Sequence, residues 1–429
     1  MTKAAPPVVI GIDAGTSGVR ALAIAPDKQV VAGGKAHFRD LGGDYRAPDV
    51  WWRALSQALA ATLADLGDRQ VRALAVDGTS GTVLPVAADG MPLATPLMYN
   101  DPVDDPDIIA RIGRIAPKTS AAHGATCGLA KALLFRALPG CRHIIHQADW
   151  LAGRFLGRFD LSDANNALKT GYDPVAQAWP DWIAATGMDV GLLPAVAAPG
   201  SVQGRIAGAV AETFGLPDDV LIVAGTTDGC ASFLATGADE PGDGVTALGT
   251  TMTVKMLTDA PIFAPEYGIY SHRIGDVWLA GGASNSGGGA LAQFFDSATI
   301  AELSRHIDPA METGLDYYPL PKAGERFPVN DPGLEPRVMP RPKDDAEFLK
   351  GLLEGIARIE SLGYRRLAEL GAPALRSMRS VGGGAANAAW TAIRRRGLAV
   401  PFLPVLSQEA AMGTALLALQ GAAREGALQ

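Results

Sequence analysis

Apolar residues in the first third of the chain fall into four short runs and one longer stripe at helical spacing. The short runs have the length and residue types of buried strands, and they cover residues 8–12, 19–24, 30–31 and 71–76. The stripe predicts a helix over residues 49–66, and its apolar face comprises Trp52, Leu55, Leu59, Leu63 and Leu66. This part of the chain is therefore predicted to fold as three strands, a helix and a fourth strand.

The rest of the chain alternates further strands with helices. Strand-like or extended runs cover residues 221–224, 245–248, 252–257, 378–381 and 400–404. A long helix is predicted over residues 347–370, where one apolar stripe ends before Gly371. Two further helices are predicted around Trp390 and over residues 409–423. Residues 316–345 are dense in proline and glycine, and their aromatic side chains predict a long ordered loop rather than a linker.

Two glycine hairpins give the two halves of the chain a similar start. Residues 14–18 and 248–252 both place Gly-Thr, followed by Ser or Thr, between two predicted strands. With 429 residues, the chain is also longer than one hydrophobic core usually serves. We therefore predict a duplicated α/β domain, with an N-terminal domain over residues 1–237 and a C-terminal domain over residues 238–429.

Composition and charge exclude several classes of protein. Hydrophobic residues make up 48% of the chain and charged residues 19%, a balance typical of folded globular proteins rather than disordered ones. The formal net charge of −8 comes from 37 Lys and Arg against 45 Asp and Glu, with no dense block of basic residues. Because nucleic-acid binding needs a clustered basic surface, no nucleic-acid partner is expected, whereas a small neutral or phosphorylated substrate stays open.

Neither the cysteines nor the N-terminus indicates an exported protein. The three cysteines form no CxxC pair and no disulfide framework. His143 and His146 lie close in sequence without an obvious third ligand, so a packing role is favoured over a zinc site. The apolar run that ends at Gly11 is too short for a signal peptide, and no window resembles a membrane span. A cytoplasmic protein without a membrane partner is expected.

Residues 13–17 combine a carboxylate with a glycine turn and two hydroxyl groups. Backbone N–H groups around Gly15 can converge on a phosphate, and Thr16 and Ser17 add hydroxyl donors. Asp13, at the strand end, can hold Mg²⁺ directly or through water. The alternative is an ordinary hairpin turn. No GxxxxGK[ST] string occurs, so a P-loop is absent, and residues 249–251 form a second candidate phosphate hairpin.

Two further segments follow buried strands and carry candidate chemistry. Residues 382–385 place three glycines before a helix, where the backbone can approach a nucleotide closely; the alternative is a tight turn. This is not GxGxxG within a first βαβ unit, so a Rossmann site is disfavoured. Asp228 lies in the segment 225–229 and can accept the proton of an attacking hydroxyl. The alternative is that Asp228 caps a helix that begins near Cys230.

These signals appear in the order phosphate hairpin, aspartate, second phosphate hairpin and glycine turn, which is the order of the actin, hexokinase and heat-shock chaperone superfamily. Within it, the chain resembles the FGGY carbohydrate kinases over nearly its whole length. The segments that carry the resemblance are residues 11–21, 148–157, 162–166, 224–228, 352–357 and 381–387. Each segment is modestly specific, and their shared order is strongly so.

The resemblance implies two ribonuclease-H-like α/β domains that face each other across a cleft for ATP and a sugar. It implies that Asp228 is the catalytic base and touches the sugar, and that Asp13 lies at the substrate and holds Mg²⁺. The residues implied to bind ATP and its phosphates are Gly15, Thr16, Ser17, Arg20, Gly249, Thr250, Gly287, Gly383, Gly384, Ala385 and Asn387. Further residues implied on the sugar side are Ser80, Asn100 and Asp101.

The chain departs from longer members of the family where the substrate is concerned. Lys131 matches the lysine of the first family signature, but the tryptophan expected after it is replaced by leucines. The Arg-Glu pair of glycerol kinases is absent, and residues 77–81 stand in its place. Together with Tyr99-Asn100 and residues 314–319, this pattern is most similar to the short D-ribulose kinases of cyanobacteria and plants. The implied reaction is the ATP- and Mg²⁺-dependent phosphorylation of D-ribulose to D-ribulose 5-phosphate.

Two alternatives stay open at the level of sequence. A nearer one is a xylulose kinase or another polyol kinase of the same family. One of a different class is an ATPase of the actin and chaperone superfamily that uses no sugar, although the long C-terminal peptide-binding domain of a chaperone is not seen. The expected partners are a sugar and ATP, and a homodimer stays open.

Overall fold

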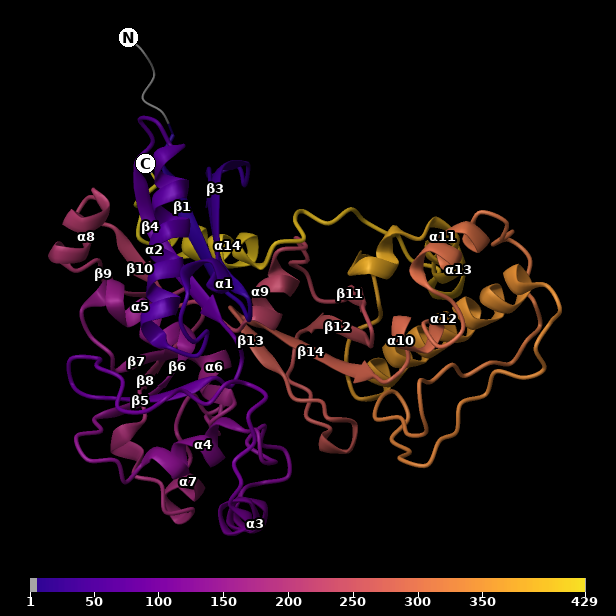
Figure 1. The fold of residues 1–429 in the computed structure, drawn as a ribbon, viewed down its shortest axis with the longest axis horizontal. Helices are drawn as coiled ribbons and strands as arrows, with labels where there is room; N and C mark the ends of the chain where they lie inside the picture. Colours follow the sequence, from indigo (N-terminus) through magenta and orange to yellow (C-terminus); the bar gives the residue numbers. More distant parts are fainter. Residues whose placement is uncertain (1–5, 429) are drawn as a thin grey trace. The chain divides into compact units, whose positions relative to one another are not determined.

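The computed structural model describes residues 6–428, and its contacts divide them into two compact units (Figure 1). The first unit comprises residues 6–237, 272–276 and 407–428, and the second comprises residues 238–271 and 277–406. Residues 1–5, part of the N-terminal segment in which no signal peptide is expected, lie outside the described range. The two units are described separately.

A six-stranded mixed sheet forms the framework of the first unit. Its strands are β1 (Val8–Ala14), β2 (Gly18–Ile24), β3 (Val30–His37), β4 (Val71–Gly78), β9 (Val202–Arg205) and β10 (Leu221–Val223). They run in the order β3-β2-β1-β4-β10-β9. β1 pairs antiparallel with β2 and parallel with β4, and β10 continues the parallel part. The predicted strands of this region are confirmed, and β3 extends well beyond the predicted apolar run because its glycines pair with β2 through the backbone.

Two helices cover opposite faces of this sheet. Helix α2 (Pro48–Ala64) packs on β2 and β3, and helix α14 (Ala410–Arg424) packs on β1 and β4. Alternate residues of β1 belong to different cores, since Ile10 and Ile12 pack on the α2 side whereas Val9 packs on the α14 side. This is the alternation expected of a strand that is buried on both faces.

The buried face of α2 differs from the predicted one at Trp52 and at Leu63, which is half-buried. Leu55 and Leu59 are fully buried as predicted, but Trp52 is half-buried and Trp51 is fully buried. The indole N–H of Trp51 donates to the carbonyl of Tyr45 at 2.7 Å. A buried indole needs such a partner, and the sequence pattern does not reveal it.

The backbone of α14 lies directly against β1 and α9 (Asp228–Leu234). A Cβ added at Gly11 would lie 2.1 Å from the amide nitrogen of Ala415, and one added at Gly413 would lie 1.9 Å from the carbonyl oxygen of Ala231. The small residues Ala411, Gly413 and Ala415 of this helix therefore mark its contact face. These contacts group residues 407–428 with the first unit, whereas the predicted division assigned them to the C-terminal domain; the division itself stays a prediction.

The other elements of the first unit lie mostly between β4 and β10 and include a separate apolar cluster around α3 and α4. They are α1 (Phe38–Leu41), β5 (Val83–Val86), α3 (Pro106–Ile115), α4 (Gly128–Phe135), β6 (His143–His146), α5 (Gln147–Leu156), β7 (Leu161–Asp163), α6 (Ala164–Leu168), α7 (Trp182–Ala185), η1 (Val190–Leu192), β8 (Ala195–Ala197), α8 (Gly208–Phe214) and β13 (His272–Ile274).

The second unit repeats the strand pattern of the first. Its strands are β11 (Asp243–Leu248), β12 (Met252–Thr258), β14 (Val277–Ser284) and β15 (Ser377–Val381), in the order β14-β12-β11-β15. β11 pairs antiparallel with β12 and parallel with β15, and β12 pairs antiparallel with β14. In the first unit, β1 pairs in the same way with β2 and β4, and β2 pairs antiparallel with β3. The topology therefore supports the predicted duplication.

Helix α12 (Asp345–Glu369) connects β14 to β15, as α2 connects β3 to β4. Its predicted apolar stripe is confirmed, since Leu352, Leu353 and Ile356 are fully buried. The remaining elements of the unit are η2 (Pro265–Tyr267), α10 (Gly288–Leu291), α11 (Ser297–Ser304), η3 (Gly383–Ala386) and α13 (Ala388–Leu398).

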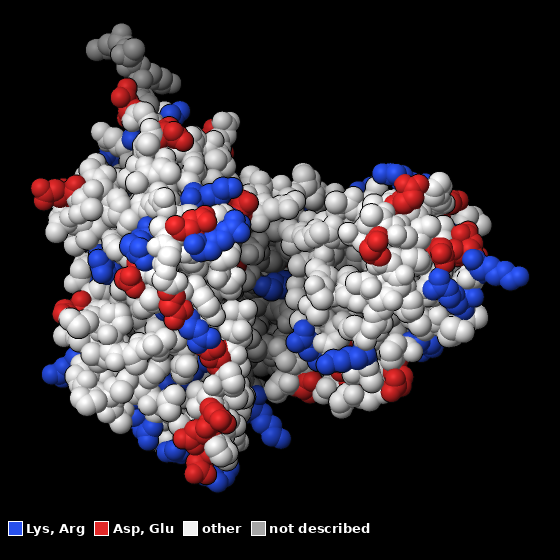
Figure 2. Space-filling model, viewed as in Figure 1, with Lys and Arg blue, Asp and Glu red and all other residues white. Residues whose placement is uncertain are grey.

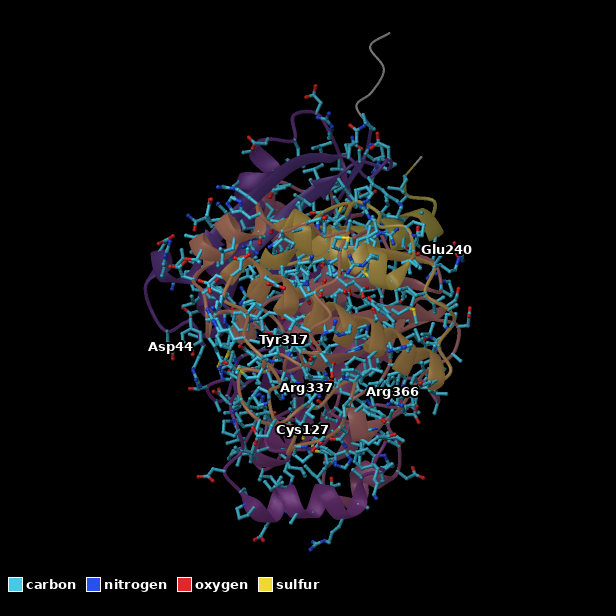
Figure 3. All side chains as sticks on the ribbon, turned by 90° about the vertical axis from the view of Figure 1, so that its right-hand side faces the viewer. Asp44, Cys127, Glu240, Tyr317, Arg337 and Arg366 are labelled. Atoms are coloured by element: carbon cyan, nitrogen blue, oxygen red, sulfur yellow. The ribbon has the colours of Figure 1, made fainter. Side chains whose placement is uncertain are left out.

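The segment before α12 is an ordered loop, as predicted. Phe327 is fully buried and Tyr317 is 2% exposed. The N–H of Tyr318 donates to the carbonyl of Arg337 at 2.7 Å, which ties two distant parts of the loop together. Figure 3 labels Tyr317 and Arg337 in this region.

Charged side chains of both signs are interspersed on the face shown in Figure 2. This distribution agrees with the scattered basic residues of the sequence. Over residues 6–428, none of the helices has the length and apolar character needed to cross a membrane.

Candidate active site

Three aspartates meet at the carboxyl end of the parallel strands of the first unit. Asp13 and Asp77 are register partners on β1 and β4. Gly78 pairs with Thr227, the residue before Asp228. Ligand sites in α/β folds form at this edge because several strands end there together, and here the edge gathers three carboxyl groups.

Burial and mutual repulsion favour the protonated forms of two of these groups. Burial raises the pKa of Asp13, and the charge of Asp228 adds to the rise, whereas Arg20 opposes it. Asp77 is fully buried, and burial together with the charge of Asp13 raises its pKa well above the usual range. The hydroxyl of Thr414 donates to Asp77. Carboxylates held this close cannot all ionise easily.

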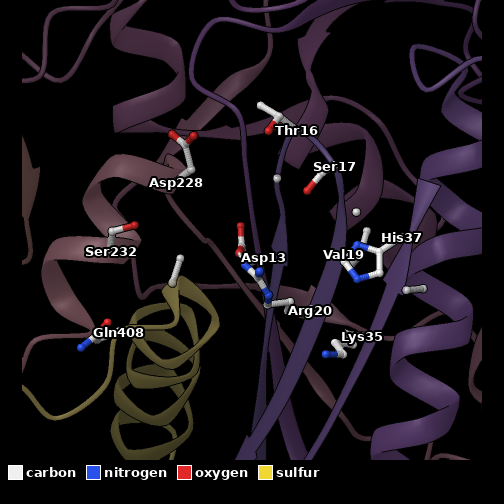
Figure 4. A pocket seen from close by; sticks show the side chains of 14 residues that line it. Asp13, Thr16, Ser17, Val19, Arg20, Lys35, His37, Asp228, Ser232 and Gln408 are labelled. Atoms are coloured by element: carbon white, nitrogen blue, oxygen red, sulfur yellow. Dashed lines mark ion pairs between the residues drawn. The ribbon is translucent and has the colours of Figure 1, made fainter. Parts of the chain in front are cut away.

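Asp13 and Asp228 line a pocket of about 260 Å³ within the first unit (Figure 4). Other lining residues that the sequence had predicted are Gly15, Thr16, Ser17 and Arg20. The sequence interpretation missed further polar lining residues, namely Lys35, His37, Ser232 and Gln408. The missed signal was the strand period of β3, because Lys35 is the cross-strand partner of Arg20 and His37 follows on the same face.

The β1–β2 hairpin presents donors and a cation to this pocket. The N–H of Gly15 donates to the carbonyl of Gly18 at 3.0 Å, which closes the turn and leaves Thr16 and Ser17 exposed at its tip. The Arg20 guanidinium lies 3.7 Å from Asp13 and 3.2 Å from Glu409. Backbone N–H groups, hydroxyls and an arginine are the groups that bind phosphate oxygens.

Asp228 is the first residue of α9, and Thr227 is its N-cap residue. Helix α9 therefore begins two residues before the predicted start near Cys230, and Asp228 lies in its first turn rather than at the cap position. Its carboxylate accepts the N–H of Gly229 at 2.7 Å and is half-buried at the pocket wall.

The second unit contains a larger pocket of about 1010 Å³. Its lining includes the predicted residues Gly249, Thr250, Gly383, Gly384 and Asn387. The sequence interpretation missed further lining residues, which are mainly apolar and include Leu248, Leu291, Phe295, Ile300, Ser304, Arg305 and Trp390. Asn387 caps α13 and also donates to the hydroxyl of Ser304 at 2.8 Å.

The glycines of this pocket differ in what surrounds them. A Cβ added at Gly383 would meet nothing within 4 Å, whereas one added at Gly384 would lie 2.6 Å from the ring of Trp390. Gly287 and Ala385, two predicted nucleotide ligands, are not among the lining residues. Gly287 instead lies against the β11–β12 hairpin, where an added Cβ would come within 2.9 Å of Thr250 and Met252.

The predicted sugar-side residues lie on two segments of the first unit outside the smaller pocket. Ser80 follows β4, and among the described residues its buried hydroxyl oxygen has no hydrogen-bond partner. Asn100 is exposed. Asp101 accepts two hydrogen bonds from Arg46, at 2.7 and 3.0 Å. The carboxylate of Asp101 is therefore engaged within the protein, whereas Ser80 retains hydrogen-bonding capacity.

The donor sets of the two pockets fit Mg²⁺ and ATP. Carboxylate oxygens such as those of Asp13 and Asp228 suit Mg²⁺, which is usually bound by one or two carboxylates plus phosphates and water. A large apolar pocket with a few polar groups suits an adenosine. Within residues 6–428, no group of three or more His, Cys, Asp and Glu side chains is arranged to hold a metal ion.

The surroundings of His146 and of the three cysteines are those of packed side chains. The ring nitrogens of His146 lie 2.8 Å from Asp149 and 3.0 Å from Thr170 in the interior, which favours the packing role over zinc. The thiols at Cys127 and Cys230 are buried, that of Cys141 is half-buried, and all three are free of disulfides.

Comparison with known proteins finds similarity to carbohydrate kinases. Residues 244–422 match the C-terminal domain of the FGGY family of carbohydrate kinases. The chain is 31% identical to a xylulose kinase of Streptomyces coelicolor over 271 residues, which are 59% of this chain and 55% of that protein. It is 26% identical to a xylulose kinase of Klebsiella pneumoniae over 389 residues, or 81% and 76% of the two chains. The chain thus spans little more than half the length of the Streptomyces relative.

Solved structures share the fold at lower identity. The xyloylose kinase of Brucella ovis superposes with a TM-score of 0.83 at 22% identity, covering 97% of this chain and 91% of that one. The two units therefore have the two-domain actin- and hexokinase-like fold, as predicted. Together, the match over residues 244–422 and this fold make the chain similar to the FGGY family of carbohydrate kinases.

Proposed function

We propose that the chain is an ATP-dependent kinase that transfers the γ-phosphoryl group of ATP to the primary hydroxyl of a ketopentose. The observation that carries the proposal is the position of Asp228, which lines one pocket together with Asp13 and the glycine hairpin. A candidate base, a candidate metal ligand and a candidate phosphate turn thus share one site, which is the arrangement that phosphoryl transfer to an alcohol needs.

In this proposal Asp228 accepts the proton of the sugar hydroxyl while the hydroxyl oxygen forms its bond to the γ-phosphorus. The bond from the γ-phosphorus to the oxygen bridging the β-phosphate breaks, and ADP leaves. Mg²⁺, when bound, neutralises charge on the phosphates, and Asp13 would hold it. Thr16 and Arg20 would donate to phosphate oxygens. Positioning and charge neutralisation would supply most of the rate enhancement.

The larger pocket would receive the adenosine of ATP. Its apolar wall offers Phe295 and Trp390 to the base, and Gly383 has open space where a ligand can approach the backbone. Gly249 and Thr250 would contact phosphates from the β11–β12 hairpin. ATP use follows the chemistry of the family whose C-terminal domain residues 244–422 match.

For the sugar, our first candidate is D-ribulose, phosphorylated on its C5 hydroxyl. Ser80 and Asn100 both donate and accept hydrogen bonds, which suits a neutral sugar with many hydroxyls. D-ribulose and D-xylulose differ in the configuration of one hydroxyl. A wrong epimer leaves a buried polar group unpaired at a cost of ~1–3 kcal/mol, which corresponds to a preference of ~5–150-fold.

D-xylulose is the second candidate. It is favoured by the relatives, since the matched proteins of Streptomyces coelicolor and Klebsiella pneumoniae are xylulose kinases. The two candidates share the reaction, the base and the nucleotide, and they differ only in the recognition of one hydroxyl.

The experiment is a comparison of kcat/KM for D-ribulose, L-ribulose, D-xylulose, xylitol, ribitol and glycerol, with ADP release as the readout. Fastest turnover of D-ribulose, with weaker activity on D-xylulose and little on glycerol, is the expected result. Preference for D-xylulose would transfer the assignment to the second candidate. ADP release that none of these sugars stimulates would contradict the kinase proposal and favour an ATPase that uses no sugar.

A further inference from the structure

The turn at residues 98–101, which carries Tyr99 and Asn100, is fixed to the first unit by two cations. The first cation is Lys131 of α4, whose side chain is fully buried. Its ammonium group donates to the carbonyl of Met98 at 2.6 Å and to the carbonyl of Gly81 at 2.8 Å. Lys131 therefore joins this turn to the segment that carries Ser80.

Burying the ammonium group of Lys131 in order to hold two carbonyls is energetically unfavourable. Burial lowers the pKa of Lys131 to about 8, an effect that the nearby charge of Asp101 opposes, as does Cys127 to a smaller degree. Removing a charge from water is unfavourable, and apolar packing usually fills such a place at lower cost. The lysine thus indicates that the spacing of the two carbonyls matters for more than stability.

The second cation is Arg46, from the segment between α1 and α2. Its two terminal nitrogens donate to the two carboxylate oxygens of Asp101, at 2.7 and 3.0 Å. A bidentate pair fixes direction as well as distance. The same carboxylate accepts the N–H of Met98 at 2.8 Å, so the ion pair also closes the turn. The Arg46 and Asp101 side chains are 33% and 17% exposed, so solvent screens the pair only in part.

A hydroxyl network joins the same two segments at a further point. The N–H of Tyr99 donates to the hydroxyl oxygen of Thr82 at 3.0 Å. The hydroxyls of Thr82 and Thr79 are hydrogen-bonded at 2.6 Å, and the Thr79 hydroxyl also donates to Gln147 at 2.7 Å. Ser80 and Asn100 therefore belong to two segments that are held together as one unit.

We propose that Arg46, Asp101 and Lys131 are positioning residues that place Asn100 and Ser80 against the sugar. This inference rests on the proposed function and deepens it. Asp101, which the sequence had suggested as a sugar ligand, acts through its ion pair with Arg46 and makes no contact with the substrate. Sugar binding then depends on the ion pair, whereas nucleotide binding does not.

A double-mutant cycle tests the role of the ion pair. The variants are Arg46→Ala, Asp101→Asn and the double variant, and the readouts are kcat and the KM values for the better ketopentose and for ATP. Each single change should raise the KM for sugar by ~10-fold, as expected for loss of one charged hydrogen bond. The KM for ATP should stay the same, and the double variant should be no worse than either single one.

Three outcomes separate this inference from its alternatives. Losses that multiply in the double variant would show that Asp101 contacts the sugar directly, and an unchanged KM for sugar in all variants would exclude any positioning role; either result overturns the inference. Lack of sugar-stimulated ADP release in the unaltered protein would instead contradict the proposed function. Arg46→Lys should restore part of the affinity because it keeps the charge without the bidentate geometry.

A matched control is the exposed ion pair of Arg158 and Asp160, which is also bidentate, with distances of 2.7 and 2.6 Å. Arg158→Ala should leave both KM values unchanged. For the buried cation, Lys131→Met should raise the KM for sugar without changing that for ATP. An equal rise in both values for Lys131→Met would show a general loss of structure and remove Lys131 from the inference.

Discussion

At Asp228 the local backbone and the pocket act on the same carboxylate. Asp228 lies in the first turn of α9 and lines the same pocket as Asp13. Asp228→Asn should lower kcat by ~10²–10⁴, the range for loss of a general base. The KM for ATP should change little, since the candidate nucleotide pocket lies in the second unit. Steady-state kinetics with ketopentose checks this, and Asp218→Asn, on the exposed surface, serves as the control. Near-normal turnover of the Asp228 variant would remove it from the mechanism.

Lys131 carries a prediction for the dependence of stability on pH. Its pKa is lowered to about 8 in the folded protein, below the ordinary value of 10.5. Between these values the unfolded chain binds more protons than the folded protein, so the contribution of Lys131 to stability rises with pH. The free energy of unfolding in urea should be measured for wild type and Lys131→Met. As the pH rises from 7 to 10, the wild type should become more stable relative to Lys131→Met. The same difference at both pH values would contradict the lowered pKa.

At the scale of elements, two glycines in the turn between β15 and α13 allow contact with a ligand to be distinguished from packing. A Cβ at Gly383 enters open space in the pocket, whereas one at Gly384 meets Trp390 and Leu248. Gly383→Val should raise the KM for ATP much more than that for sugar and leave the melting temperature nearly unchanged. Gly384→Val should lower the melting temperature through overpacking. If Gly383→Val affects both KM values equally, the turn has only a structural role.

Helix α14 depends on close backbone contact with α9 and β1. A Cβ at Gly413 would lie 1.9 Å from the carbonyl oxygen of Ala231, so Gly413→Ala forces the helices apart. Overpacking of this kind costs ~1–3 kcal/mol. The control is Gly113 in α3, where an added Cβ meets nothing within 4 Å and where Gly→Ala should stabilise the protein by ~0.5–1 kcal/mol. Denaturant unfolding of both variants measures the contrast, and equal effects would exclude the close contact.

At the scale of the whole molecule, the two candidate pockets belong to separate units, and this makes their ligands separable. A ligand at 100 times its Kd stabilises the folded state by ~2.7 kcal/mol. ADP should raise the melting temperature of Arg46→Ala as it does for wild type, whereas ketopentose should raise it less. Gly383→Val should show the reverse pattern. If each variant lost its response to both ligands, the assignment of sugar and nucleotide to different units would be wrong.

Local sequence patterns were enough to predict most of the elements and much of the candidate chemistry. Strands β1, β2 and β4, the stripe of α12 and the two glycine hairpins follow from local periodicity and turn residues, which need no knowledge of distant contacts. The carboxylates of Asp13 and Asp228 are indicated in the same way, because each lies in a glycine-containing segment near the end of a predicted strand.

The distant segments that complete each site are known only from the folded chain. Arg46 meets Asp101 through a pairing that no local pattern encodes. The assignment of α14 to the first unit rests on the close approach at Gly11 and Gly413. The physical reason is that these choices depend on packing and hydrogen bonds between residues far apart in the chain, whereas a sequence pattern reports only which face of its own element is apolar.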